Sequence, residues 1–165
     1  MEQPKVGLLN IGAEAGKGRV LEREAYDLLS AIPGVEFVGN VEGTDLALSK
    51  ADVIVCDGYT GNILLKTAEG TAKLVLKYVL EAVSEPEYAE AVQILAPAVM
   101  GLRDRLNPER VGGAHLLGVN GVVVVTHGSS TRLGISTAVG TAAEAADGGL
   151  PGLIAAGLAE SEKVS

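Results

Sequence analysis

The strongest constraint on the fold of this chain is a run of four valines late in the sequence. Residues 121–126 are Gly-Val-Val-Val-Val-Thr. β-branched side chains favour strands, and an unbroken run of them is typical of a strand buried on both faces of a parallel sheet. Three shorter apolar runs, at residues 6–11, 35–39 and 51–56, predict three more strands. We therefore expect a sheet of mainly parallel strands.

Helical patterns alternate with these strands. Residues 18–31 carry apolar side chains at helical spacing, and Pro33-Gly34 ends that helix. Two more helices are predicted near residues 129–146 and 151–163. Strands that alternate with helices predict a doubly wound α/β architecture, and 165 residues fit one such domain with one core. Only 3% of the residues are aromatic, so valine, leucine, isoleucine and alanine must build that core.

Residues 61–106 break the alternation with two long helical patterns. The first places these apolar side chains on one stripe: Leu65, Ala68, Ala72, Val75, Val79 and Val83. Ser84-Glu85-Pro86-Glu87 then predicts a capping box with proline at the first helical position. The second pattern has apolar side chains at alternating spacings of four and three: Tyr88, Val92, Leu95, Val99, Leu102 and Leu106. Pro97 predicts a kink. The two patterns predict a helical hairpin, which packs within the chain or projects and pairs with its mate in a dimer.

Composition excludes several classes of function. The formal net charge is −8, which argues against nucleic-acid binding because that needs a basic face. Two isolated histidines and one cysteine give no metal-ligand spacing, so neither a metal nor another cofactor is expected. Cys56, inside an apolar strand, is interpreted as a small core residue rather than a nucleophile. A lone cysteine and the lack of a long apolar run predict a cytoplasmic protein.

Ligands of open α/β sheets bind beyond the carboxyl ends of the strands, and three glycine-rich polar junctions fall there. The first, residues 10–18, is only loosely similar to a P-loop. Three residues instead of four separate Gly12 from Gly16, and Gly18 rather than Ser or Thr follows Lys17. Lys17 is therefore either an anion-binding side chain or a solvated loop lysine.

The second junction, residues 57–62, joins the third strand to the long helix. Gly58 and Gly61 allow tight turns and close approach of a ligand. Asn62 either caps the helix or donates its amide to a phosphate or a developing oxyanion. Asp57 is interpreted as a turn former rather than a catalytic acid.

The third junction, residues 127–132, follows the valine run. Ser129 or Ser130 is expected to cap the next helix, whose free N–H groups make an anion site. His127 is either a general base, since histidine titrates near neutrality, or a structural residue. His115 is interpreted as incidental. The chemistry indicated is capture and polarisation of an anion, without a covalent enzyme intermediate.

Together these segments resemble the PlsX-type phosphate acyltransferases of bacteria. The resemblance covers nearly the whole chain and rests on the following motifs: residues 6–12 with Gly16-Lys17-Gly18, residues 37–43, residues 55–62 with 65–67 and 69–70, residues 112–114 with 116–119, and residues 127–130. Family members are about twice as long, so we expect this chain to match their C-terminal half. After Gly18 the family usually carries Asn and Glu, where this chain has Arg19 and Val20.

The resemblance implies a three-layer α/β/α sandwich akin to isocitrate dehydrogenases and phosphate acetyltransferases. It also implies a homodimer joined through the projecting 61–106 hairpin. The implied reaction converts acyl-[acyl carrier protein] and inorganic phosphate to acyl phosphate for phospholipid synthesis. The resemblance further implies contact with the inner face of the membrane through the hairpin tip. Here Glu81, Glu85 and Glu87 lie at that tip, so we expect weak peripheral contact.

The family's essential lysine and asparagine fall on Lys17 and Asn62. The resemblance adds the following residues for binding phosphate or substrate: Gly16, Gly58, Gly61, His127, Gly128 and Ser129. The carrier protein is acidic, so docking requires a local cationic patch. Candidates are Lys66, Lys73 and Lys77, or Arg103, Arg105 and Arg110. Two alternatives stay open, namely an enzyme that uses a coenzyme A thioester and a non-catalytic fragment that only folds and dimerises.

Overall fold

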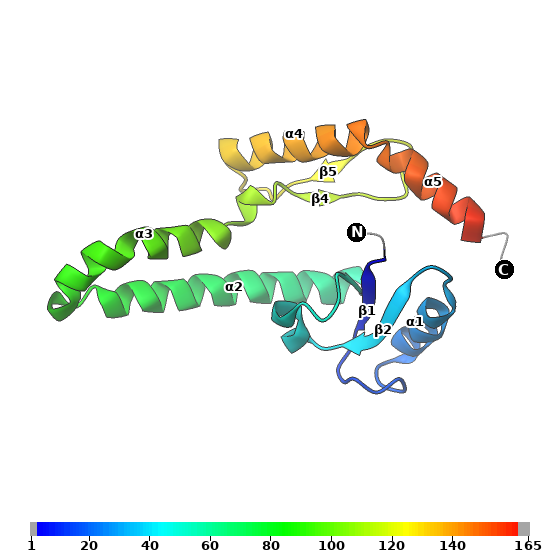
Figure 1. Ribbon diagram of the computed structural model, residues 1–165, viewed down its shortest axis with the longest axis horizontal. Helices are drawn as coiled ribbons and strands as arrows, with labels where there is room; N and C mark the ends of the chain where they lie inside the picture. Colours follow the sequence, from blue (N-terminus) through cyan, green and yellow to red (C-terminus); the bar gives the residue numbers. More distant parts are fainter. Residues whose placement is uncertain (1–2, 162–165) are drawn as a thin grey trace. The chain divides into compact units, whose positions relative to one another are not determined.

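The computed structural model of the chain describes residues 3–161, which form two compact units that divide between Thr71 and Ala72. Figure 1 shows the order of their helices and strands. The first unit holds a parallel sheet and the second a short antiparallel ladder with helices. Each unit is described separately below.

The first unit is built on three parallel strands. Their bounds are β1 Lys5–Leu9, β2 Glu36–Val41 and β3 Val53–Val55, in the sheet order β2-β1-β3. Helix α1, Val20–Ala31, connects β1 to β2, and a 3₁₀ helix at Gly43–Leu48 precedes β3. Helix α2, Gly58–Val83, begins directly after β3. Because β1 and β3 are adjacent and parallel, the loops that follow them leave the same edge of the sheet.

The core of the first unit lies on the central strand. Its buried apolar side chains are Val6, Leu8, Leu9 and Val41. A Cβ at Gly7 would lie 2.6 Å from Val41 Cγ1, so this glycine lets Val41 pack against the β1 backbone. On β2, the ring of Phe37 meets Tyr26 of α1 edge-on, with the ring centroids 5.1 Å apart.

The second unit follows from residue 72 onward. After the end of α2 it contains a 3₁₀ turn at Pro86–Tyr88, α3 at Ala89–Arg105, a second 3₁₀ turn at Pro108–Arg110, β4 at Ala114–His115, β5 at Val124–Val125, α4 at Arg132–Asp147 and α5 at Leu150–Ser161. Helix α4 packs against β5 and the second 3₁₀ turn. The expected extension of the last helix to residue 163 lies outside the described residues.

A pair of glycines makes this packing possible. Gly112 has φ +85° and Gly113 has φ +152°. A Cβ at Gly112 would lie 2.8 Å from the backbone nitrogen of Ala138 in α4, and one at Gly113 would lie 2.5 Å from the carbonyl oxygen of Val125 in β5. Only glycine lets the chain pass this close to both elements.

The valine run does not form the buried parallel strand that its composition predicts. Only Val124 and Val125 are in a strand, and they pair antiparallel with Ala114 and His115. Val123 is 42% exposed and Val125 56% exposed. Within the described residues, β4 is the strand that pairs with β5, so the run lacks the neighbouring strands that would bury both of its faces.

Both long helices of the 61–106 region form, but their apolar stripes stay exposed. Leu65 is 60% exposed, Leu95 50% and Leu102 46%. Pro97 lies inside α3, which continues through it. The predicted capping box is wrong, because Ser84 Oγ donates back to the carbonyl of Leu80 at 2.6 Å instead of capping the next turn.

The expected α/β class with a mainly parallel sheet is confirmed. The three-layer sandwich, the single domain and the projecting hairpin stay predictions. Across residues 3–161, none of the helices is long and apolar enough to cross a bilayer.

Candidate active site

Two asparagines hold the loop between β1 and α1. Asn10, next to the end of β1, donates from Nδ2 to the carbonyl of Lys17 at 3.1 Å and accepts from the backbone nitrogen of Ile11 at 2.8 Å. Asn40 on β2 donates to the carbonyl of Glu14 at 2.7 Å. Both side chains are buried, so each bond replaces lost water. The loop therefore has a defined backbone path.

Gly18 closes this loop in a conformation that only glycine adopts easily. Its φ is +89°. A Cβ there would lie 2.6 Å from Asn10 Oδ1 and 2.8 Å from Glu22 Cβ. Steric exclusion of a Cβ therefore explains why the last position of Gly16-Lys17-Gly18 is glycine.

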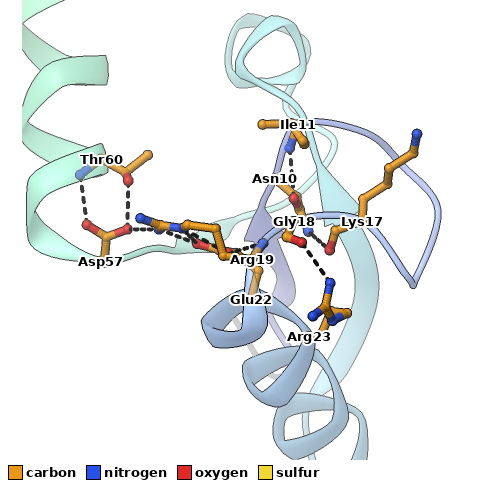
Figure 2. Close-up of polar contacts among 9 residues, drawn as sticks. All are labelled: Asn10, Ile11, Lys17, Gly18, Arg19, Glu22, Arg23, Asp57 and Thr60. Carbon is orange, nitrogen blue, oxygen red and sulfur yellow. Dashed lines mark hydrogen bonds and ion pairs between the residues drawn. The ribbon is translucent and has the colours of Figure 1, made fainter.

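Lys17 points away from the start of α2. Its stem lies over Gly12, where an added Cβ would be 3.2 Å from Lys17 Cγ. Its ammonium is 3.8 Å from Glu14 Oε1, and the side chain is 49% exposed. Figure 2 shows the ammonium directed away from Asp57 and Thr60. In this state the lysine is a half-exposed loop cation with an acidic neighbour.

Asp57, rather than Asn62, caps helix α2. Asp57 Oδ1 accepts from the backbone nitrogen of Thr60 at 2.9 Å, and Oδ2 accepts from the hydroxyl of Thr60 at 2.6 Å. The interpretation of Asp57 as a turn former is therefore confirmed. The N-cap alternative for Asn62 is wrong, because α2 begins at Gly58 and Asn62 is its fifth residue. Asn62 is exposed and keeps its amide available.

Arg19 lies between the two predicted site segments, and the sequence analysis did not single it out as a candidate residue. Its Nη2 lies 2.7 Å from Asp57 Oδ2, and its Nε lies 2.9 Å from Glu22 Oε1 (Figure 2). Hydrogen bonds from Thr60 first, and from Arg19 after them, hold the pKa of Asp57 well below its usual range. The hydrogen bond from Arg19 likewise lowers the pKa of Glu22. The one signal in the sequence was the departure from the family pattern after Gly18.

An open cavity of about 560 Å³ lies beside this network. It is lined largely by apolar side chains of β1 and α2, including Leu9, Ile63 and Leu64, with Arg19 and Thr60 at its wall. A smaller cavity of about 220 Å³ lies on the side of Asp57 and Cys56. Glu22 and Thr60 line both cavities, so the ionic network stands between them.

Cys56 is exposed rather than part of the core, which corrects the expectation from its apolar strand. Its sulfur nevertheless lies against Gly61, where an added Cβ would be 2.8 Å away. Partial burial, and then the nearby Asp57 charge, raise the pKa of the Cys56 thiol. A raised pKa leaves little thiolate at neutral pH, so Cys56 is a poor nucleophile.

The third junction belongs to the second unit. His127 Nδ1 lies 2.6 Å from Ser129 Oγ and accepts from the backbone nitrogen of Ser129 at 3.2 Å. Because Nδ1 accepts, the neutral ring carries its proton on Nε2, which makes His127 a donor toward solvent.

The expected serine caps of the next helix are wrong. Thr131 caps α4, with its hydroxyl accepting from the backbone nitrogen of Leu133 at 3.3 Å. The carboxylate of Glu109 accepts from the backbone nitrogen of Thr131 at 2.6 Å. An internal anion therefore already lies at the start of α4.

The structure brings the predicted residues together only in part. Lys17 follows β1 and Asn62 follows β3, so both leave one edge of the sheet, and Gly16, Gly58 and Gly61 lie in the same two segments. Among the described residues, no hydrogen bond or ion pair joins Lys17 to Asn62. His127, Gly128 and Ser129 lie in the second unit. No group of three potential metal ligands occurs in residues 3–161.

Comparisons with known proteins identify a matching family and several similar proteins. A family model described as "fatty acid synthesis protein" matches residues 1–152. The chain is 44% identical to a phosphate acyltransferase of Cereibacter sphaeroides, over 98% of its own length and 45% of the relative. It is 41% identical to the phosphate acyltransferase of Paracoccus denitrificans over the same shares.

A third relative matches over a shorter part of the chain. The chain is 44% identical to the phosphate acyltransferase of Pseudothermotoga lettingae, over 84% of its length and 43% of the relative. The chain therefore spans less than half the length of these curated relatives. Since the family model covers nearly all of it, this chain belongs to the fatty acid synthesis protein family, the PlsX-type phosphate acyltransferases that its motifs resemble.

Proposed function

We propose that this chain carries part of the active site of an acyl-[acyl carrier protein]:phosphate acyltransferase. The proposal rests on the family match and on three relatives that are named phosphate acyltransferase. The product, an acyl phosphate, feeds phospholipid synthesis. Because the chain spans 45% of such a relative, the complete activity also needs the groups that the rest of the relative supplies.

One structural observation supports the site most directly. The loop with Lys17 follows β1, and the helix start with Asn62 follows the adjacent strand β3. Asp57 already accepts from the backbone nitrogens of Thr60 and Gly61 in the first turn of α2, so the donor proposed on this side is the exposed amide of Asn62. A phosphate held there has a cation from one loop and an amide from the other.

The reaction needs positioning more than acid–base chemistry. A phosphate oxygen attacks the thioester carbonyl carbon, and the carbonyl electrons move onto oxygen. Collapse of this oxyanion breaks the C–S bond, and the carrier thiolate leaves and takes a proton. Lys17 holds the phosphate, and Asn62 donates to the phosphate or the developing oxyanion. His127, Gly128 and Ser129 of the second unit stay predicted substrate-binding residues.

Lys17 must leave Glu14 to take this role. The two charged groups are 3.8 Å apart and both side chains are about half exposed or more. Such a pair is weak, about 0–1 kcal/mol. Phosphate, with its greater charge, competes with Glu14 for the ammonium, so the lysine turns to the anion when phosphate binds.

The acidic carrier protein docks on cations that are not already neutralised. Three candidate cations already have acidic partners. Lys66 lies 3.4 Å from Glu69, and Lys77 lies 3.5 Å from Glu81. Arg110 lies 2.7 Å from Asp104. Within residues 3–161, no ion pair engages Lys73, Arg103 or Arg105. These three residues are the preferred docking candidates.

The exposed stripes of α2 and α3 support a homodimer. Apolar side chains such as Leu95 and Leu102 are about half exposed in the single chain, and a second copy would cover them. Contact with the inner face of a membrane stays weak because of Glu81, Glu85 and Glu87. We place the protein in the cytoplasm. Light scattering measures the molar mass of the wild-type chain and of the Leu95→Glu variant. We expect a dimeric mass for the wild type and a monomeric mass for the variant, and a monomeric mass for both proteins rejects the dimer.

The activity is tested in a chimera in which this chain replaces the matching segment of the Cereibacter sphaeroides relative. Acyl-[acyl carrier protein] and phosphate are supplied, and acyl phosphate is trapped with hydroxylamine. Lys17→Ala and Asn62→Ala should each lower the rate by about a hundredfold. Lys50→Ala, which removes an exposed cation elsewhere in the first unit, is the control. Rates near wild type for both site variants reject the assignment.

Two comparisons separate the alternatives. A coenzyme A thioester of the same acyl chain should react more slowly than the carrier-protein thioester, and the reverse order favours a phosphate acetyltransferase-like enzyme. Titration calorimetry of the chain with phosphate and with acyl carrier protein tests the non-catalytic fragment. Heat from neither ligand favours that fragment.

A further inference from the structure

Arg19 joins two segments that the proposed function requires to act together. On one side, its backbone nitrogen donates to Glu22 Oε2 at 2.7 Å and its Nε to Glu22 Oε1 at 2.9 Å, which fixes it at the start of α1. On the other side, its Nη2 donates to Asp57 Oδ2 at 2.7 Å. Figure 2 shows this bridge from the loop to the helix start.

The Asp57 end of the bridge is part of the first turn of α2. The same carboxylate accepts from the backbone and the hydroxyl of Thr60, and the carbonyl of Asp57 accepts from the backbone nitrogen of Gly61 at 2.9 Å. Asn62 is the next residue. A shift of Asp57 therefore moves the turn that carries Asn62.

The Arg19 end is just as firmly tied to Lys17. Gly18 separates the two residues, and its carbonyl accepts from Arg23 Nη1 at 3.0 Å. The carbonyl of Lys17 accepts from Asn10 Nδ2 at 3.1 Å. With both carbonyls held, the position of the Arg19 backbone determines where the Lys17 side chain starts.

A direct role in binding phosphate does not fit the charges around Arg19. Its single positive charge faces two carboxylates, Glu22 and Asp57, which are 13% and 25% exposed. The local sum is −1, so the cluster as a whole repels an anion. The guanidinium is committed to holding protein groups.

We propose that Arg19 is a positioning residue, a clamp that sets the distance between the Lys17 loop and the Asn62 turn. That this distance matters for phosphate binding rests on the proposed function. The hydrogen bonds from Arg19 to Glu22 and Asp57 do not depend on that function. Without Arg19, two carboxylates from two elements face each other across the gap and repel. A planar guanidinium can bond both at once, whereas an ammonium bonds them less well.

The choice of variants separates positioning from charge. Arg19→Met removes the clamp and one positive charge. Asp57→Asn keeps the helix cap, because asparagine caps as well as aspartate, but removes the partner and one negative charge. Charge alone predicts that Asp57→Asn tightens phosphate binding, because this variant removes one of the two carboxylates that repel the anion. If Arg19 positions, both variants weaken it.

The test is titration of the full chain with inorganic phosphate, followed by NMR. We expect Arg19→Met and Asp57→Asn each to raise the Kd about tenfold, the double variant to raise it no further, and Arg19→Lys to recover part of the loss. Lys50→Met, which breaks the exposed pair with Asp45, is the matched control and changes the Kd less than twofold. Tighter binding by Asp57→Asn, or additive losses, overturn the proposal.

A second measurement does not depend on the proposed function. Hydrogen exchange of the amides in residues 10–18 and 57–62 should quicken severalfold in Arg19→Met and stay unchanged in Lys50→Met. Unchanged exchange in both segments rejects the clamp. If the wild-type chain binds no phosphate, the proposed function of these residues fails, and the exchange result alone decides whether Arg19 joins the two segments.

Discussion

The carboxylate of Glu109 accepts two hydrogen bonds from Thr131, one from the backbone nitrogen at 2.6 Å and one from the hydroxyl at 2.9 Å. Glu109 lies in the 3₁₀ turn that follows α3, and Thr131 is the N-cap of α4. The pair therefore ties two elements of the second unit across 22 positions of sequence.

Removal of this carboxylate should destabilise the second unit. Glu109→Ala leaves the Thr131 backbone nitrogen without its partner and takes a negative charge from the start of α4. We expect a loss of about 1 kcal/mol in the free energy of unfolding. Urea titration followed by circular dichroism measures it. Glu144→Ala, on an exposed face of the same helix, is the control, and equal losses in both variants contradict the prediction.

Gly18→Ala should cost stability for a steric reason. The added Cβ would meet Asn10 Oδ1 at 2.6 Å, at a φ of +89°. The expected loss is more than about 1 kcal/mol. Gly70→Ala, in open space inside α2, should instead stabilise by up to about 1 kcal/mol. Thermal melts of the two variants distinguish the cases, and a Gly18→Ala protein as stable as wild type shows that the loop conformation is not required.

The low pKa of Asp57 predicts how stability depends on pH. A carboxylate whose pKa falls on folding stabilises the folded chain at pH values above its unfolded pKa of 3.8, and the contribution fades as pH falls toward the folded pKa. Asp57→Asn should thus be less stable than wild type near neutrality, and the difference should shrink below about pH 4. Urea unfolding at several pH values measures this. A constant difference at all pH values excludes Asp57 as its source.

Cys56 should react slowly although it is exposed. Burial of its sulfur and the Asp57 charge both raise the pKa of the thiol, so less thiolate is present at a given pH. Alkylation by iodoacetamide at mildly alkaline pH should be slower than that of free cysteine. Asp57→Asn removes one of the two causes and should quicken it. A wild-type rate equal to that of free cysteine contradicts this account.

The first unit could be predicted from sequence because its signals are local. The run at residues 6–11 has glycine after it and a helical pattern next, and β1 forms at Lys5–Leu9. The N-cap alternative for Asn62 placed the start of α2 five residues too late, because Asp57 is the N-cap and accepts two hydrogen bonds from Thr60. Local chemistry decided between two plausible caps, and spacing alone did not.

The features that the sequence did not predict depend on partners far away along the chain. The valine run carries strand propensity, but its burial depends on which strands pair with it, and here that is a two-residue antiparallel ladder. Arg19 was noticed only as a departure from a family pattern, because its partner Asp57 is 38 residues away. Whether Lys17 and Asn62 share a bound anion is likewise set by tertiary geometry.

The glycine pair at residues 112 and 113 has a genetic consequence. Every amino acid that one nucleotide change can reach from a glycine codon carries a Cβ. At Gly113 that atom would fall 2.5 Å from a backbone oxygen, which cannot rotate out of the way as a side chain can. Every single-nucleotide change that replaces either glycine therefore disturbs the packing of α4 or β5, so we expect these two positions to stay glycine while the surrounding sequence changes.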